Sequence, residues 1–94
     1  MPHVLIRHKV KDFTSWKPVF DEHASTRKAA GSKGGILFRS AGDPNEVVII
    51  FDWENVEHAR RFIESEDLRE TMQRAGVADR PDIYFLDEVD RPAS

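Results

Sequence analysis

His8 is the side chain in this sequence best placed to act as a general base. It alternates with Val4, Ile6 and Val10, so a strand over residues 3–10 would put all four side chains on one face. A neutral imidazole in an apolar pocket can take a proton from a phenol or an enol, because imidazole titrates near neutral pH. The alternative is a partly buried histidine bonded to a backbone group, and the residues alone leave both open.

His23 is the second candidate base and lies in a predicted helix. It follows Phe20 by three residues and precedes Arg27 by four, so the three side chains can border one helical face. Together they could hold an anionic oxygen of a substrate. The simpler interpretation is that Asp21, Glu22, His23 and Arg27 form the solvated outer surface of the helix. Both interpretations of His23 therefore stay open: a residue of the site, or part of the solvated helix surface.

Aromatic side chains and a further histidine complete the candidate site. Trp16, Phe20, Trp53 and Phe62 could stack against a flat ligand, although aromatics at helical or strand spacing also serve as core. The two roles can coexist in one side chain. His58 lies one turn before Phe62 at the margin of an apolar stripe, so it faces either a pocket or solvent.

Composition excludes several functions. The 94 residues are 39% hydrophobic and 33% charged, with a formal charge of −3 and no cysteine. A single domain over 1–94 fits this length. The acidic balance and the lack of a basic stripe argue against nucleic acid as a partner, and the lack of cysteine excludes thiolate chemistry.

The apolar run near the N-terminus is too short for a signal peptide or a membrane span, so we expect the cytoplasm and no membrane. His3 and His8 would point to opposite strand faces, and no metal-ligand spacing is found.

Periodicity predicts the elements that must hold these residues. Strands are expected at 3–10, 36–41, 46–53 and 82–89. The first helix should begin after Asp12 or Thr14, with Pro18 in or near its first turn, and end at Gly31. Residues 31–35 are interpreted as a turn, and 42–45 as a second one. Asn55 should cap the second helix, Asp67 should begin a short one that ends at Gly76, and the tail 90–94 should be frayed.

This order predicts an α+β fold of the ferredoxin-like βαββαβ type. Its four-stranded antiparallel sheet would carry the helices on one face. Residues 47–51 are consecutively apolar, so this strand needs cover on both faces. A second copy of the chain is the economical cover for the face without helices, and we therefore expect a homodimer.

Several segments together resemble a known family. They are VLIRHKV followed by DFTSW, then GDPNEVVIIFDWENVEHARRFIES, EDLRETMQRAGV and DIYFLDEV. The combination, spanning His3 to Val89, is similar to the antibiotic-biosynthesis-monooxygenase-like branch of the dimeric α/β-barrel superfamily. The resemblance implies pairing into a dimeric α/β barrel and a pocket between helices and sheet. Haem-degrading members have a downstream histidine ligand where this chain has Met72, which disfavours haem.

The resemblance implies a small cofactor-independent monooxygenase-like protein acting on an aromatic or enolic small molecule. On this hypothesis no cofactor or metal is needed. The catalytic candidates are His8 and His23, and the ligand-binding candidates are Trp16, Phe20, Arg27, Trp53, His58 and Phe62. Two alternatives stay open: a ligand-binding or stress-associated module without turnover, and a polyketide cyclase or isomerase of the same fold.

Overall fold

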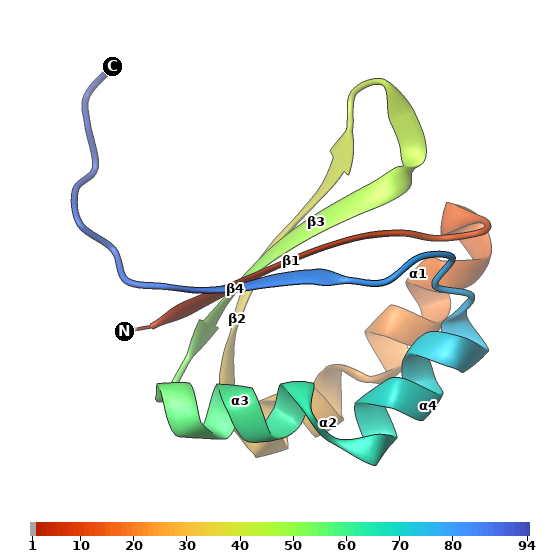
Figure 1. The fold of residues 1–94 in the computed structure, drawn as a ribbon, viewed down its shortest axis with the longest axis horizontal. Coiled ribbons are helices and arrows are strands. Elements are labelled where there is room, and N and C mark those ends of the chain that lie inside the picture. Colours follow the sequence, from red (N-terminus) through yellow and green to blue (C-terminus); the bar gives the residue numbers. More distant parts are fainter. Residues whose placement is uncertain (1) are drawn as a thin grey trace.

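Four strands form one antiparallel sheet, and all helices lie on one of its faces (Figure 1). The computed structural model describes residues 2–94. Along the chain its elements are β1 His3–Lys9, α1 Phe13–Glu22, α2 Ala24–Ala30, β2 Ser32–Ser40, β3 Asp43–Trp53, α3 Val56–Ile63, α4 Glu66–Ala75 and β4 Asp82–Leu86. The sheet order is β2-β3-β1-β4. The ferredoxin-like α+β fold predicted from the sequence is thereby confirmed. None of the helices in this described part is long and apolar enough to cross a membrane.

The core lies between the sheet and the helices, because alternate residues of the two central strands point there. On β1 these are Val4, Ile6 and His8, as the alternation predicted. On β3 the buried positions are Val47, Ile49, Phe51 and Trp53. The register places Ile6 opposite Ile49 and His8 opposite Val47, so the two rows form one apolar surface beneath the helices.

Side-chain caps begin α1, α3 and α4, and glycines end α2 and α4. The carboxylate of Asp12 accepts from the N–H of Thr14, and Asn55 accepts from the N–H of His58, as expected. The third cap differs from the prediction, because Ser65 rather than Asp67 precedes α4 and accepts from the N–H of Leu68 at 3.2 Å.

The helix predicted up to Gly31 is two helices that meet at His23. His23 has a ψ of −2°, well away from the helical value near −42°, so the axis turns at this residue. Pro18 lies inside α1 rather than in its first turn, and its missing N–H leaves the carbonyl of Thr14 without the usual intrahelical partner. The bend turns the side chain of His23 inward, where it is buried.

Strand β2 begins earlier than predicted, and the expected turn at 31–35 is mostly a β-bulge. Ser32 pairs with Trp53 and Gly35 with Phe51, so β2 carries one extra residue between the two pairs. Gly34 has a φ of 94°, which L side chains rarely adopt. A Cβ on Gly35 would lie 2.1 Å from the carbonyl oxygen of Ile50, so only glycine fits against β3.

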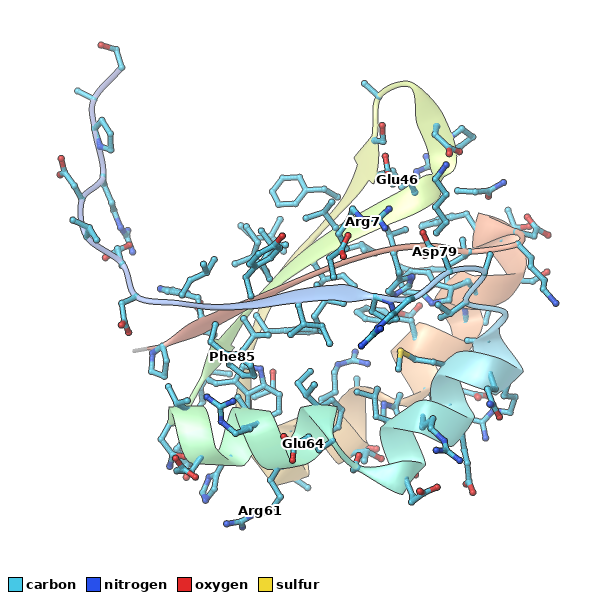
Figure 2. All side chains as sticks on the ribbon, viewed as in Figure 1. Arg7, Glu46, Arg61, Glu64, Asp79 and Phe85 are labelled. Carbon is cyan, nitrogen blue, oxygen red and sulfur yellow. The ribbon has the colours of Figure 1, made fainter. Side chains whose placement is uncertain are left out.

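The sheet face without helices carries apolar and charged groups. Ile36, Phe38, Tyr84 and Leu86 are exposed there. Arg7 lies on the same face beside Glu46 and Asp79 (Figure 2), with N–O distances of 2.9 and 3.0 Å, and also contacts Asp82 at 2.8 Å. These hydrogen bonds, that to Asp82 first, raise the pKa of Arg7. The open face of the sheet is thus apolar over β2 and over the C-terminal end of β4, which carries Tyr84 and Leu86. It is charged around Arg7.

Strand β4 ends at Leu86, three residues earlier than predicted. Leu86 pairs with His3, the first residue of β1, so no partner strand continues beyond it. The remaining residues, 87–94, form neither helix nor strand and leave the sheet on the side opposite the helices (Figure 1).

Candidate functional site

An apolar cavity with a volume of about 60 Å³ lies between the sheet and the helices. Its floor comes from β1, β3 and β4, and its walls from α1, α2, α3 and α4. Two histidines and one arginine are the ionisable groups in its wall. The complete lining is Ile6, His8, Trp16, Phe20, His23, Arg27, Ile49, Phe51, Phe62, Ile63, Leu68, Thr71, Met72, Ala75, Pro81 and Ile83.

His8 is a buried, neutral imidazole in this cavity. Its side chain is 3% exposed, and its ring stands edge-on to Trp16 with centroids 5.8 Å apart. Burial lowers the pKa of His8 below its ordinary value of 6.5, and the opposing influences of the Lys9 backbone and Asp79 are smaller. Its Nδ1 is buried without a hydrogen-bond partner. An unprotonated imidazole in the cavity wall can accept a proton from a bound ligand.

His23 is also buried, so the interpretation as a solvated helix surface does not hold for this residue. It is 7% exposed, and its Nε2 lies 2.7 Å from Oδ2 of Asp67 in the first turn of α4. An ionised carboxylate only accepts hydrogen bonds, so Nε2 of His23 is the donor in this pair. Asp67 was missed as a site residue, because nothing in the sequence connects positions so far apart.

Aromatic side chains line one wall of the cavity. Trp16 stacks on Phe20 with centroids 4.8 Å apart, and Phe20 lies 6.2 Å from Phe51. Together with the edge contact from His8 to Trp16, these rings form a continuous wall. Phe51, in the apolar run of β3, was not among the predicted site residues, because the run alone does not show which members face a cavity.

Phe62 and Trp53 differ in their roles. Phe62 lines the cavity, with its ring 5.7 Å from that of His23. Trp53 lies behind it at 5.3 Å, is 1% exposed and does not reach the cavity. Trp53 is therefore core that supports the wall, although its Nε1 is buried without a partner.

Arg27 stands at one end of the cavity. Its guanidinium carbon lies 4.0 Å above the ring of Phe20, and one N–H donates to the carbonyl oxygen of Phe20 at 2.8 Å. Burial lowers the pKa of Arg27. Within residues 2–94 no carboxylate lies in ion-pair distance of this side chain, so most of its donors are free for a ligand.

His58, like Trp53, is a predicted ligand-binding residue that lies outside the cavity. Its Nδ1 lies 3.0 Å from a carboxylate oxygen of Glu54, beside Gly31 and in the N-terminal turn of α3. It borders a separate hollow with Arg61, a side chain that points away from the sheet (Figure 2). The structure thus brings six of the eight predicted residues into one cavity wall and leaves Trp53 and His58 outside it. Among the described residues no group of three metal-ligating side chains is found.

This combination of topology and cavity defines a class: small ferredoxin-like α+β proteins with an apolar space between helices and sheet. No family model and no curated protein matches the chain. Solved structures match it over nearly its whole length. The chain has the fold of proteins described as antibiotic biosynthesis monooxygenases, as the sequence resemblance implied.

Three solved structures illustrate this likeness. A proposed antibiotic biosynthesis monooxygenase from Bordetella bronchiseptica is 20% identical with a TM-score of 0.78, covering 94% of this chain and 96% of that one. Its counterpart from Caulobacter crescentus is 19% identical with a TM-score of 0.74, covering 95% and 90%. A mutant of SnoaB, a cofactor-independent oxygenase from Streptomyces nogalater, is 16% identical with a TM-score of 0.75, covering 99% and 97%. At these identities the likeness establishes the shared fold.

Proposed function

We propose that this protein is a small cofactor-independent oxygenase that binds an aromatic or enolic molecule in the helix–sheet cavity. The observation that carries the proposal is the buried His8 in the cavity wall, whose pKa burial lowers, so that the imidazole stays neutral at physiological pH. The base stands beside Trp16 in a wall that is apolar apart from His23, Arg27 and Thr71. The oxygenase activity of SnoaB, which has this fold, supports the choice of reaction.

The reaction is written for a phenol as substrate. His8 takes the phenolic proton, and the resulting anion donates electrons from a ring carbon to dioxygen, forming a carbon–oxygen bond. The peroxide is protonated by the imidazolium, and its O–O bond then breaks. The ring C–H becomes C=O, one oxygen atom stays in the quinone product and the other leaves as water. Dioxygen is the oxidant, and His8 returns to its neutral form.

His23 and Asp67 supply a second proton acceptor in the same cavity wall. Hydrogen bonding to the carboxylate fixes the His23 ring and its tautomer, with Nδ1 unprotonated. We assign His23 the proton that leaves the ring carbon when the peroxide collapses. His23 passes this proton to the departing hydroxide, which leaves as water, and the imidazole is restored. Phe20 and Phe62 exclude bulk water from this step, which protects the reactive anion.

The cavity must expand to hold a ring. Its volume of about 60 Å³ is well below the ~150 Å³ of an engineered cavity known to bind benzene. Met72 lines the cavity and has an unbranched, flexible side chain that can change rotamer. We therefore expect ligand binding to move Met72 and Phe20, and single rings to be preferred in the inner space.

Oxygen uptake tests the proposal. Purified protein is incubated with a panel of phenols and with anthrone, while dissolved dioxygen and product are measured together. His8→Gln and His23→Gln are each expected to lower turnover by roughly 10²-fold or more. His3→Gln, a histidine bonded to Asp52 outside the cavity, is the matched control. Unchanged turnover in the His8→Gln/His23→Gln double variant would refute the assignment.

The same experiment separates the two alternatives. Product that forms without consumption of dioxygen identifies a cyclase or isomerase that uses the same base. Ligand binding without any product identifies a non-catalytic binding module. Either result replaces the oxygenase proposal.

We also propose that a second copy covers the open face of the sheet and that the protein works in the cytoplasm. Ile36, Phe38 and Tyr84 expose apolar rings and chains on that face, and surfaces of this kind on small domains commonly mark an interface. The cysteine-free composition supports a reducing compartment, which fractionation of the producing cells tests.

A further inference from the structure

An open groove with a volume of about 530 Å³ runs beside the cavity, between α2 and the first half of β2. Phe20, Arg27, Ile49 and Phe51 line both the groove and the cavity. The stacked pair of Phe20 and Arg27 therefore stands between the two spaces. A ligand whose ring enters the cavity past this pair leaves its remaining part in the groove.

The groove is cationic although the whole chain is acidic. Arg27, Lys28 and Lys33 line it, and no acidic side chain does, whereas the formal charge of the chain is −3. Lys33 has a distant carboxylate neighbour, Glu54 at 3.9 Å, and both side chains are largely exposed. In the described structure neither Arg27 nor Lys28 has a carboxylate within ion-pair distance. Among residues 2–94, the charge of the groove is thus compensated only by the longer-range attraction of Asp21 for Arg27 and by the contact between Lys33 and Glu54.

Arg27 is the group that would hold an anion most strongly. It is half-buried, and its one hydrogen bond goes to the carbonyl oxygen of Phe20. The planar guanidinium offers five N–H donors in a fork that matches the two oxygens of a carboxylate. A partly desolvated cation gains more from such a pair than an exposed lysine does, because the surrounding dielectric is lower.

The β-bulge leaves room for the ligand next to these cations. Gly34 and Gly35 line the groove without side chains, and a Cβ on Gly34 would meet no atom within 4 Å. Lys33, from β2, and Lys28, from α2, line the same groove. The groove therefore offers space, an apolar floor from Leu37 and Ile49, and positive charge.

We propose that the groove binds a carboxylate of the same ligand whose ring enters the cavity. The substrate class is then an aromatic or enolic acid whose carboxylate is joined to the ring by a short chain. Arg27 pairs with the carboxylate, and Lys28 and Lys33 attract it. This inference rests on the proposed function for the place of the ring, whereas the anion site is tested by binding alone.

Two matched probes test the site: para-hydroxyphenylpropanoate and the uncharged para-hydroxyphenylpropanol of the same length. Dissociation constants are measured by NMR titration, following backbone amide resonances. The carboxylate probe is expected to bind about tenfold more tightly, which a hydrogen-bonded charged group can supply. It should shift the amide resonances of Gly34 and Gly35, and added salt should weaken it. The alcohol should shift resonances of cavity residues only.

Variants assign the effect to the groove. Arg27→Gln should remove the preference for the carboxylate, and Arg27→Lys should keep part of it because the charge remains. Arg69→Gln, the same change on the exposed side of α4, is the control and should leave the preference intact. Thermal melting of each variant verifies that it is folded. If Arg27→Gln does not fold, Arg27→Lys still tests the site.

The outcomes separate this inference from the proposed function. Equal affinity for both probes, or a preference that survives Arg27→Gln, overturns the carboxylate site while turnover of neutral phenols still supports the oxygenase. A carboxylate preference in a protein that never consumes dioxygen supports the site and overturns the oxygenase. If neither probe binds at millimolar concentration, the carboxylate site is overturned.

Discussion

Nε2 of His23 lies 2.7 Å from Oδ2 of Asp67 and joins the bend between α1 and α2 to the first turn of α4. The carboxylate is largely exposed, whereas the imidazole is buried. This geometry holds the ring against the cavity and leaves one nitrogen free to accept a proton. Asp67 is therefore a positioning residue for His23.

Replacing Asp67 tests that role. Asp67→Asn should lower turnover by roughly 10²-fold, because the amide can hold the wrong tautomer of His23. Asp67→Glu should recover part of it, and the pH profile of kcat should change in Asp67→Asn. Glu66→Gln, in the same turn of α4 but without contact to His23, is the control for helix stability. Equal losses in both variants would assign Asp67 to structure alone.

The burial of His8 predicts a loss of stability in acid. Its folded-state pKa is lowered from 6.5, so below pH 6.5 the unfolded chain binds a proton that the folded chain does not. The contribution is fully present above pH 6.5 and is lost as pH falls through the folded-state value. Within that window the free energy of unfolding should decrease by up to about 1.4 kcal/mol per pH unit from this group.

Urea titrations of the wild type and His8→Gln across pH 5 to 7 measure this term, with the range chosen around the ordinary imidazole pKa of about 6.5. The variant should show a shallower dependence on pH, whatever its stability at pH 7. Parallel curves for the two proteins would contradict the burial of an uncharged His8.

The bulge in β2 predicts a strict need for glycine at one position. Gly35→Ala should lower the free energy of unfolding by about 1–3 kcal/mol or more, because its Cβ would lie 2.1 Å from the backbone oxygen of Ile50, which cannot move freely. Gly42→Ala is the matched control, since a Cβ there meets nothing within 4 Å. Denaturant unfolding of the two variants provides the comparison, and equal stability would contradict the close approach of β2 to β3.

The apolar side chains exposed on the open face of the sheet, among them Ile36, Phe38 and Tyr84, predict that the protein forms a homodimer. Light scattering at micromolar concentration should give twice the mass of one chain. Phe38→Lys, on the open face, should shift the equilibrium toward monomer, because it places a charge in the apolar part of the interface. Ala29→Lys, at an exposed position of α2 on the helical side, should leave the mass unchanged. A wild-type monomer would refute the homodimer.

Local patterns were enough to predict the layers of the fold. The alternation along β1 identified the buried face that carries His8. Residue type and position identified the cap at Asn55 and gave Asp12 as one of two candidates for the first cap. These features depend on neighbours within a few residues. The bond between His23 and Asp67 joins distant residues and was missed. The cap at Ser65 was also missed, although it is local, because the prediction assigned the cap to Asp67.

The site was predictable in part for the same reason. Helical spacing grouped Phe20, His23 and Arg27, yet it could not decide between cavity and solvent, because that depends on the bend at His23 and on α4. The position of His58 was also undecided, and its pairing with Glu54 holds it outside. The bulge that shapes the groove depends on contact between Gly35 and β3, which no local signal reveals.

The edge contact between His8 and Trp16 connects intrinsic tryptophan fluorescence to the charge of His8. Trp16 and Trp53 are 3% and 1% exposed, so all indole emission originates in the interior. We expect protonation of His8 to lower the emission of Trp16, because it places a positive charge against the indole, whereas Trp53 lies behind Phe62. Intrinsic fluorescence measured against pH in the wild type and in His8→Gln tests this expectation.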